Sequence, residues 1–142
     1  AKGLSFSGSA RAELITLSDA IREILSLAET AFLHQDVEAA MKVEPLEQVI
    51  DTLKEEMRTR HILRMQQGQC SIEAGFVWSD LLTDLERTSD HCSNIAGCVI
   101  DAAQHNLNLH ETLHAIRRND DSFQRRFRSY LEAYSLPTLP SM

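Results

Sequence analysis

Two pairs of acidic side chains have the types and the spacing of a cation site. Glu47 and Asp51 are four residues apart, and Glu86 and Asp90 repeat this spacing. Residues four apart lie on one side of a helix, so each pair would present two carboxylates together. Carboxylates that gather in one place repel one another and raise each other's pKa unless a cation lies between them. Their oxygens are hard ligands that suit magnesium, manganese, calcium or iron, whereas zinc prefers histidine and cysteine.

Three long segments with helical apolar periodicity must position these acids. They cover residues 9–34, the region of residues 43–57, and the region from about residue 77 onwards. Pro45 predicts either a kink in the second segment or a helix that restarts just before it. The apolar positions are Leu14, Leu17, Ile21, Ile24, Leu25, Ala28 and Phe32, then Val43, Leu46, Ile50, Leu53 and Met57, then Val77 or Trp78, Leu81, Leu85, Thr88, Cys92, Ile95 and Val99. These stripes predict an all-α fold, an up-down-up three-helix bundle of long helices.

The turn between the second and third segments predicts which acids meet. Gly68 suits the left-handed residue that follows a helix end, and Ser71 can cap the next helix. In an antiparallel hairpin, positions equally far from the turn lie opposite each other. Both acidic pairs are centred about 29 Å from the turn, at a rise of about 1.5 Å per residue. The sequence therefore predicts that the four carboxylates face one another across two helices and act as metal ligands.

Composition and charge narrow the classes of protein. The chain has 142 residues, enough for one domain, and 43% of them are apolar. Its net charge of −7 disfavours a nucleic acid partner, because a phosphate backbone requires a basic face. Cys70, Cys92 and Cys98 lack the spacing of paired ligands, which favours free thiols in a reducing compartment. No apolar run is long enough for a membrane span, and the opening AKGLSF without a methionine favours a piece of a longer protein.

The composition changes near the end of the third segment. We expect residues 1–106 to form the bundle and residues 107–142 to form a short helical C-terminal extension and tail. Asn108 and Glu111 have the spacing of a capping box that would begin a short helix. The stretch SFQRRFRSYLEAY can form another helix before the tail. Its arginines could contact anionic lipid or a partner, although a solvated helix face is the simpler interpretation.

The stretch HETLH, residues 110–114, offers a competing interpretation. It matches the H-E-x-x-H pattern, in which His110 and His114 would bind zinc and Glu111 would activate water, with Glu132 as a third ligand. A pattern with three fixed positions arises readily by chance, and Glu111 already has a role in the helix cap. A zinc metalloprotein therefore stays an alternative. So does a helical dimerisation module whose acids face water or pair with nearby arginines, such as Arg58, Arg60, Arg64 and Arg87.

Other single residues near the acids have simpler interpretations. We expect His61 and His91 to be partly buried and hydrogen-bonded, and Trp78 to lie in the core. Asp80 and Asp84 point away from the acidic pair on the same segment, so we expect them at the surface.

The residues around the second acidic pair resemble a known family. DLERTSDHCSNIA, residues 84–96, closely resembles the signature DLERIGDhaxNIA of PhoU proteins, and EPLEQVIDTLKEEM, residues 44–57, resembles the helix before it. The run over residues 60–96, with the ending YSLP, is similar to the cytoplasmic PhoU-like domain at the C-terminus of bacterial sodium/phosphate cotransporters. The resemblance covers most of residues 9–105.

The resemblance implies a site, a cofactor and a role. PhoU proteins bind metal through E(D)xxxD motifs, which fall here on Glu47 and Asp51 and on Glu86 and Asp90. The implied cofactor is a divalent or ferric ion: iron, zinc, manganese or magnesium. The implied role is non-enzymatic: tuning phosphate uptake at the cytoplasmic face of the plasma membrane, through the membrane domain of the transporter.

Two departures from the family pattern matter. PhoU proteins have two three-helix units, whereas this chain has one, so a complete metal cluster would require a second chain, as in a homodimer. Thr88 and Ser89 also replace the usual Ile-Gly, which could alter packing beside the site.

Overall fold

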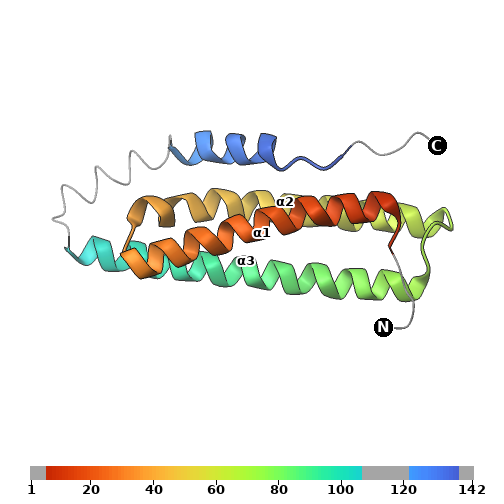
Figure 1. Ribbon diagram of the computed structural model, residues 1–142, viewed down its shortest axis with the longest axis horizontal. Helices are drawn as coiled ribbons and strands as arrows, with labels where there is room; N and C mark the ends of the chain where they lie inside the picture. Colours follow the sequence, from red (N-terminus) through yellow and green to blue (C-terminus); the bar gives the residue numbers. More distant parts are fainter. Residues whose placement is uncertain (1–5, 107–121, 138–142) are drawn as a thin grey trace.

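Three long helices form the body of the molecule. The computed structural model describes residues 6–106 and 122–137. Helices α1 (Gly8–His34), α2 (Val37–Gln66) and α3 (Ile72–Asn106) lie side by side along one long axis and alternate in direction (Figure 1). The described residues contain no strand, and the predicted up-down-up helical bundle is confirmed. Within them, no helix combines the length and the apolar character that a membrane crossing requires.

Short polar side chains begin the first two helices. Ser7 caps α1 by accepting a hydrogen bond of 3.2 Å from the Ala10 N–H. Gln35, with φ 51°, ends α1 in the left-handed region, and the next residue is the N-cap of α2. Asp36 accepts a hydrogen bond of 3.2 Å from the Ala39 N–H. These caps satisfy backbone donors that a helix start leaves free.

The turn between α2 and α3 follows the predicted chemistry. Gly68 has φ +72°, a left-handed conformation that glycine adopts without steric cost. Its N–H donates to the Met65 carbonyl at 3.1 Å, and the Gln69 N–H donates to the Arg64 carbonyl at 2.8 Å. This pair of bonds is a Schellman motif, which closes the end of α2. Ser71 then caps α3 by accepting a backbone hydrogen bond of 3.1 Å.

Helix α2 continues through Pro45. It begins at Val37, so the predicted restart just before the proline is wrong. The cap at Asp36 starts the helix earlier, and Pro45 itself is buried. Burial of the apolar side of α2 outweighs the single backbone hydrogen bond that the proline removes.

The core follows the predicted stripe of α2 and departs from those of α1 and α3. The five predicted positions on α2 are at most 2% exposed: Val43, Leu46, Ile50, Leu53 and Met57. Leu25 and Phe32 on α1 are 46% and 61% exposed, and Ile95 on α3 is 39% exposed, so these three predictions are wrong. On α3 the buried apolar residues are Ala74, Trp78, Leu82, Cys92, Ala96 and Val99. Apolar periodicity locates the apolar side of a helix but not how far that side turns towards each neighbour, so the buried stripes of α1 and α3 differ slightly from the predicted ones.

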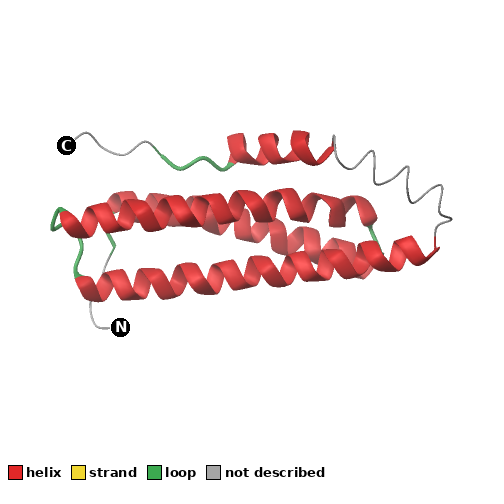
Figure 2. Cartoon of the chain, turned by 180° about the vertical axis from the view of Figure 1, so that it is seen from behind, coloured by secondary structure: helices red, strands yellow, loops and turns green. Residues whose placement is uncertain are grey.

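A C-terminal segment lies along the bundle. Residues 122–133 are helical, as the sequence predicted, and run beside the long helices (Figure 2). Arg126 donates to Glu38 on α2 at 2.9 Å, and the Tyr134 hydroxyl donates to Glu23 on α1. The apolar side chains that pack against the core are Phe127, Tyr130, Tyr134 and Leu136. The helix predicted to begin at Asn108 lies outside the described residues.

A buried ion pair joins α1 to the turn end of α2. Glu13 is 1% exposed, and its two oxygens accept from the Arg64 guanidinium at 2.9 and 3.1 Å. Arg60 lies 3.4 Å from the same carboxylate. The Arg64 guanidinium also lies 5.7 Å from the centre of the Trp78 ring. Because both partners are withdrawn from water, each charge depends on the other.

Replacing Glu13 by glutamine should lower the free energy of unfolding by about 3 kcal/mol or more, because Arg64 would stay buried without a counter-charge. Urea unfolding measures this change, with Glu29→Gln, an exposed position on the same helix, as the matched control. Equal stability of the two variants would contradict the importance of this pair.

Candidate metal centre

Three of the four predicted ligands come together between α2 and α3. Glu47, Asp51 and Asp90 each offer a carboxylate oxygen, and these oxygens lie within 4.8 Å of one another. Glu47 is 9% exposed, whereas the Asp51 side chain is 44% exposed and Asp90 is exposed. The group therefore has a buried floor and a side that is open to water.

The register of the hairpin brings these residues together. Glu47 and Asp90 are equally far from the centre of the turn, as are Glu44 and Ser93, whose side chains are hydrogen-bonded at 2.7 Å. The turn at Gly68 therefore sets the level at which the acids meet, about thirty ångströms along the hairpin at a rise of about 1.5 Å per residue.

Glu86 lies outside this group and is paired with a lysine. Its Oε1 is 2.5 Å from the Lys54 Nζ. Side chains on a helix lean towards its N-terminus, so in an antiparallel pair they lean in opposite directions. Asp51 leans away from the turn, and Glu86, at the same distance from the turn, leans towards it. This lean brings Glu86 within reach of Lys54, and the ion pair holds it there.

Lys54 is the residue at this site that the sequence reasoning missed. Its side chain is only 8% exposed, and its Nζ lies 3.4 Å from Glu55 and 4.0 Å from Asp51. Lys54 could have been found from the sequence, because it lies seven residues after Glu47 and therefore on the same side of α2. Three of the four arginines considered as partners of the acids bind elsewhere: Arg58 contacts Glu55 and Thr83, Arg60 contacts Glu13 and Glu56, and Arg64 contacts Glu13.

The three clustered acids have more negative charge than nearby basic side chains neutralise. Burial, followed by the charge of Asp51, raises the pKa of Glu47 to about 8. In the described part of the chain, no lysine, arginine or histidine nitrogen lies within 4.0 Å of a carboxylate oxygen of Glu47 or Asp90. Asp51 Oδ1 is buried and accepts no hydrogen bond. The group thus has acceptor capacity that the protein leaves unused.

The negative charge of the neighbouring acids also raises the pKa of Lys54. Burial alone would lower its pKa, but the hydrogen bond and the charge of Glu86 outweigh burial, with Glu55 adding to the effect. The pKa of Lys54 is therefore raised, and the ammonium group stays charged at neutral pH.

Comparisons with known proteins identify the family. The model of the PhoU domain family matches residues 14–99, more than half of the chain. This chain belongs to the PhoU domain family. The phosphate-specific transport system accessory protein PhoU homolog 1 of Thermotoga maritima is 30% identical over 88 residues. That alignment covers 62% of this chain and 38% of the relative, so the chain matches well under half of the relative's length. No solved structure shows a significant match.

The PhoU match contains the whole carboxylate group and Lys54, whereas residues 122–137 lie beyond it.

Near the group, Asp80 and Asp84 are exposed, as predicted. His91 is also exposed, so its predicted partial burial is wrong. On a helix this long, a position beside the apolar stripe can face either the neighbouring helix or water.

His61 belongs to a polar network at the turn end of this PhoU domain. It is 3% exposed and stacks on Trp78, with ring centres 5.0 Å apart. Its Nδ1 lies 3.1 Å from Arg64 Nη2, and its Nε2 lies 3.1 Å from Cys70 Sγ. Arginine has only donors, so Nδ1 accepts. The predicted hydrogen bonding of His61 is confirmed, and the side chain is more deeply buried than the predicted partial burial.

The competing HETLH motif, residues 110–114, lies outside the described residues. Glu132, its proposed third ligand, is exposed on the C-terminal helix.

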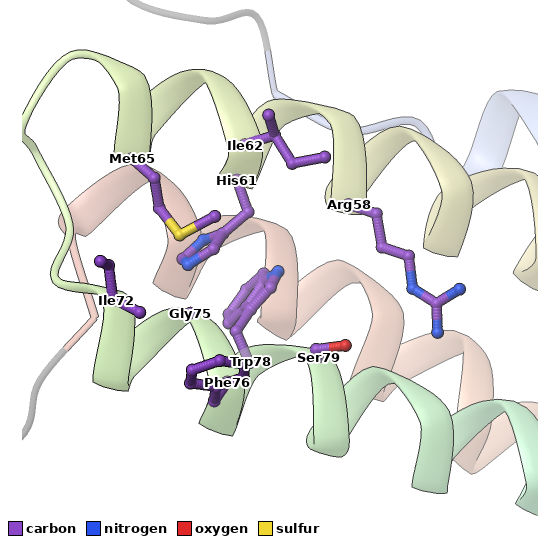
Figure 3. A pocket seen from close by; sticks show the side chains of 9 residues that line it. All are labelled: Arg58, His61, Ile62, Met65, Ile72, Gly75, Phe76, Trp78 and Ser79. Carbon is purple, nitrogen blue, oxygen red and sulfur yellow. The ribbon is translucent and has the colours of Figure 1, made fainter.

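An apolar pocket of about 280 Å³ opens beside the turn, well along the hairpin from the acids. Figure 3 shows Met65 and Ile62 from α2 and Phe76 from α3 around it, with Trp78 at its base. Gly75 leaves room for Met65, because a Cβ there would lie 2.5 Å from the Met65 sulfur.

The raised pKa of Glu47 predicts a pH dependence of stability in metal-free protein. Folded Glu47 keeps its proton up to about pH 8, whereas the unfolded chain loses it near the ordinary glutamate pKa of 4.5. The free energy of unfolding should therefore fall as the pH rises through this window, by at most about 1.4 kcal/mol per pH unit. Glu47→Gln should remove this part of the slope and be the more stable protein at pH 9. Urea unfolding of chelator-treated protein between pH 4 and 9 measures it.

The exposed Glu29→Gln variant is the control for a general charge effect. Parallel pH profiles for Glu47→Gln and the wild type would contradict the prediction.

Proposed function

We propose that this chain is a metal-binding, non-enzymatic regulatory domain in phosphate transport. More specifically, it is the cytoplasmic PhoU-like domain of a sodium-dependent phosphate cotransporter, attached to the membrane domain at the inner face of the plasma membrane. Membership of the PhoU family and the name of the Thermotoga maritima relative support the link to phosphate transport. The similarity of residues 60–96 to cotransporter sequences supports the narrower assignment.

The single observation that carries the metal proposal is the convergence of Glu47, Asp51 and Asp90 within 4.8 Å. A buried carboxylate with raised pKa, beside an acceptor oxygen without a hydrogen bond, is an environment that a cation would stabilise. The donor set consists of oxygens alone, which fits magnesium, manganese or ferric iron better than zinc. When bound, the ion would supply positive charge that neutralises the acids and ties α2 to α3.

Three protein oxygens leave room for further ligands. Magnesium and ferric ions commonly take six, so water or a second chain would supply the others on the open side of the group. A homodimer fits this need. Several strongly exposed apolar side chains could contact a second copy or the transporter: Ile15, Phe32, Leu33, Ile72 and Phe76.

The regulatory role follows from what these residues do to the hairpin. Without a cation, Asp51 and Asp90 repel each other across the helices, and Glu47 keeps its proton. With a cation, the same side chains hold the helices together. A change in cation occupancy would thus alter the stiffness of α2 and α3, which the attached transporter can sense as a change in its contact surface.

Metal content tests the proposal. Full-length chain purified without an affinity tag and equilibrated with manganese should contain bound metal by elemental analysis, and Asp90→Asn should lower the affinity at least tenfold, because it removes one charged ligand of three. Asp84→Asn, an exposed aspartate on the same helix, is the matched control and should bind like the wild type.

His110→Ala separates the zinc alternative. Metal that persists in Asp90→Asn but disappears in His110→Ala would overturn the proposal in favour of the HETLH motif. Absence of metal from a stable dimer would favour a plain dimerisation module.

A further inference from the structure

The geometry points to Lys54 as a built-in counter-ion that competes with the metal and sets the affinity of the site. This inference rests on the proposed metal site and names its regulator. In the structure the Lys54 Nζ lies 2.5 Å from Glu86 and 4.0 Å from Asp51 Oδ1. It therefore withholds Glu86 from the carboxylate group and partly screens Asp51.

A metal ion bound by the acids would repel the ammonium group of Lys54. A cation held by Asp51 Oδ1 at about 2.1 Å would lie within about 6 Å of the Nζ. At that distance, in a partly buried seam, an ammonium group and a divalent ion repel each other strongly. The Lys54 side chain is 8% exposed, so water screens this repulsion poorly.

Metal binding would therefore break the ion pair between Lys54 and Glu86. As the ion enters, Lys54 Nζ leaves Glu86 and turns towards water on the open side of the group, where Asp51 is 44% exposed. Four rotatable bonds make this movement possible without a change in the backbone. The freed Glu86 carboxylate, on α3 one turn from Asp90, then becomes available as a fourth ligand.

A purely structural ion pair would behave differently. If Lys54 only joined α2 to α3, its loss would weaken the fold and leave the intrinsic affinity for metal unchanged. A competing counter-ion instead opposes the metal, so its loss raises that affinity. The two roles differ in the sign of one measurable quantity.

Calorimetric titration of the chelator-stripped full chain with manganese measures that quantity. Lys54→Met keeps the apolar stem and removes the charge, and it should bind manganese at least tenfold more tightly than the wild type. Arg87→Gln removes one positive charge from an exposed neighbour of Glu86 and should change the affinity less than threefold. Lys54→Met/Glu86→Gln should lose most of the gain, because the fourth carboxylate is gone.

A second variant protects the test against a folding defect. Lys54→Gln keeps a hydrogen-bond donor for Glu86 without the charge, so it should fold where Lys54→Met does not and should also bind manganese more tightly. Lysine acetylation read by mass spectrometry adds a measurement on the wild type. Lys54 should be modified several-fold faster in the manganese-loaded protein than in the stripped protein, because its Nζ is released.

The outcomes separate this inference from the metal site itself. If the wild type binds manganese through Asp90 but Lys54→Met and Lys54→Gln bind it no more tightly, the competing role of Lys54 is wrong and the metal site stands. If neither the wild type nor the lysine variants bind manganese, both proposals are wrong. Tighter binding by the lysine variants, reversed by Glu86→Gln, supports both.

Discussion

A carboxylate buried between helices must have a counter-charge or keep its proton, and this constraint governs the polar chemistry of the bundle. Glu13, at 1% exposure, is held by two hydrogen bonds from Arg64. Glu86 has Lys54 at 2.5 Å. Glu47 is nearly as buried as Glu13 but has acids as its neighbours, so its pKa rises to about 8. Basic side chains thus supply the counter-charge for Glu13 and for Glu86, whereas Glu47 has none. This missing counter-charge is the reason to propose a cation beside Glu47.

The geometry of that level depends on a turn far away from it. The Schellman motif around Gly68 fixes the end of α2, and Ser71 starts α3. From there, two straight helices carry the register to Glu47 and Asp90, equally far from the turn. The opposed lean of side chains on antiparallel helices then brings Asp51 towards Asp90, and the ion pair with Lys54 holds Glu86 outside the group.

The family match and the physical features coincide in part. The PhoU match over residues 14–99 contains the carboxylates, the lysine and the turn. The C-terminal segment lies beyond it yet packs against the core through Phe127 and Tyr134. This segment covers one side of the bundle, while the acids open towards water between α2 and α3.

Patterns along the chain were enough to predict the helices, the turn and the level of the acids. Five apolar positions on α2 repeat at intervals of three and four, and Gly68 and Ser71 have the residue types of a helix end and of a helix start between two such stripes. The pairing of charges became clear from the packed helices alone. Periodicity places a residue on one side of a helix but does not define how far that side turns towards each neighbour. Periodicity therefore could not predict that Phe32 is exposed and that Glu13 is buried. Nor could it predict the ion pair between Glu86 and Lys54, because that pair depends on side-chain length and lean across two packed helices.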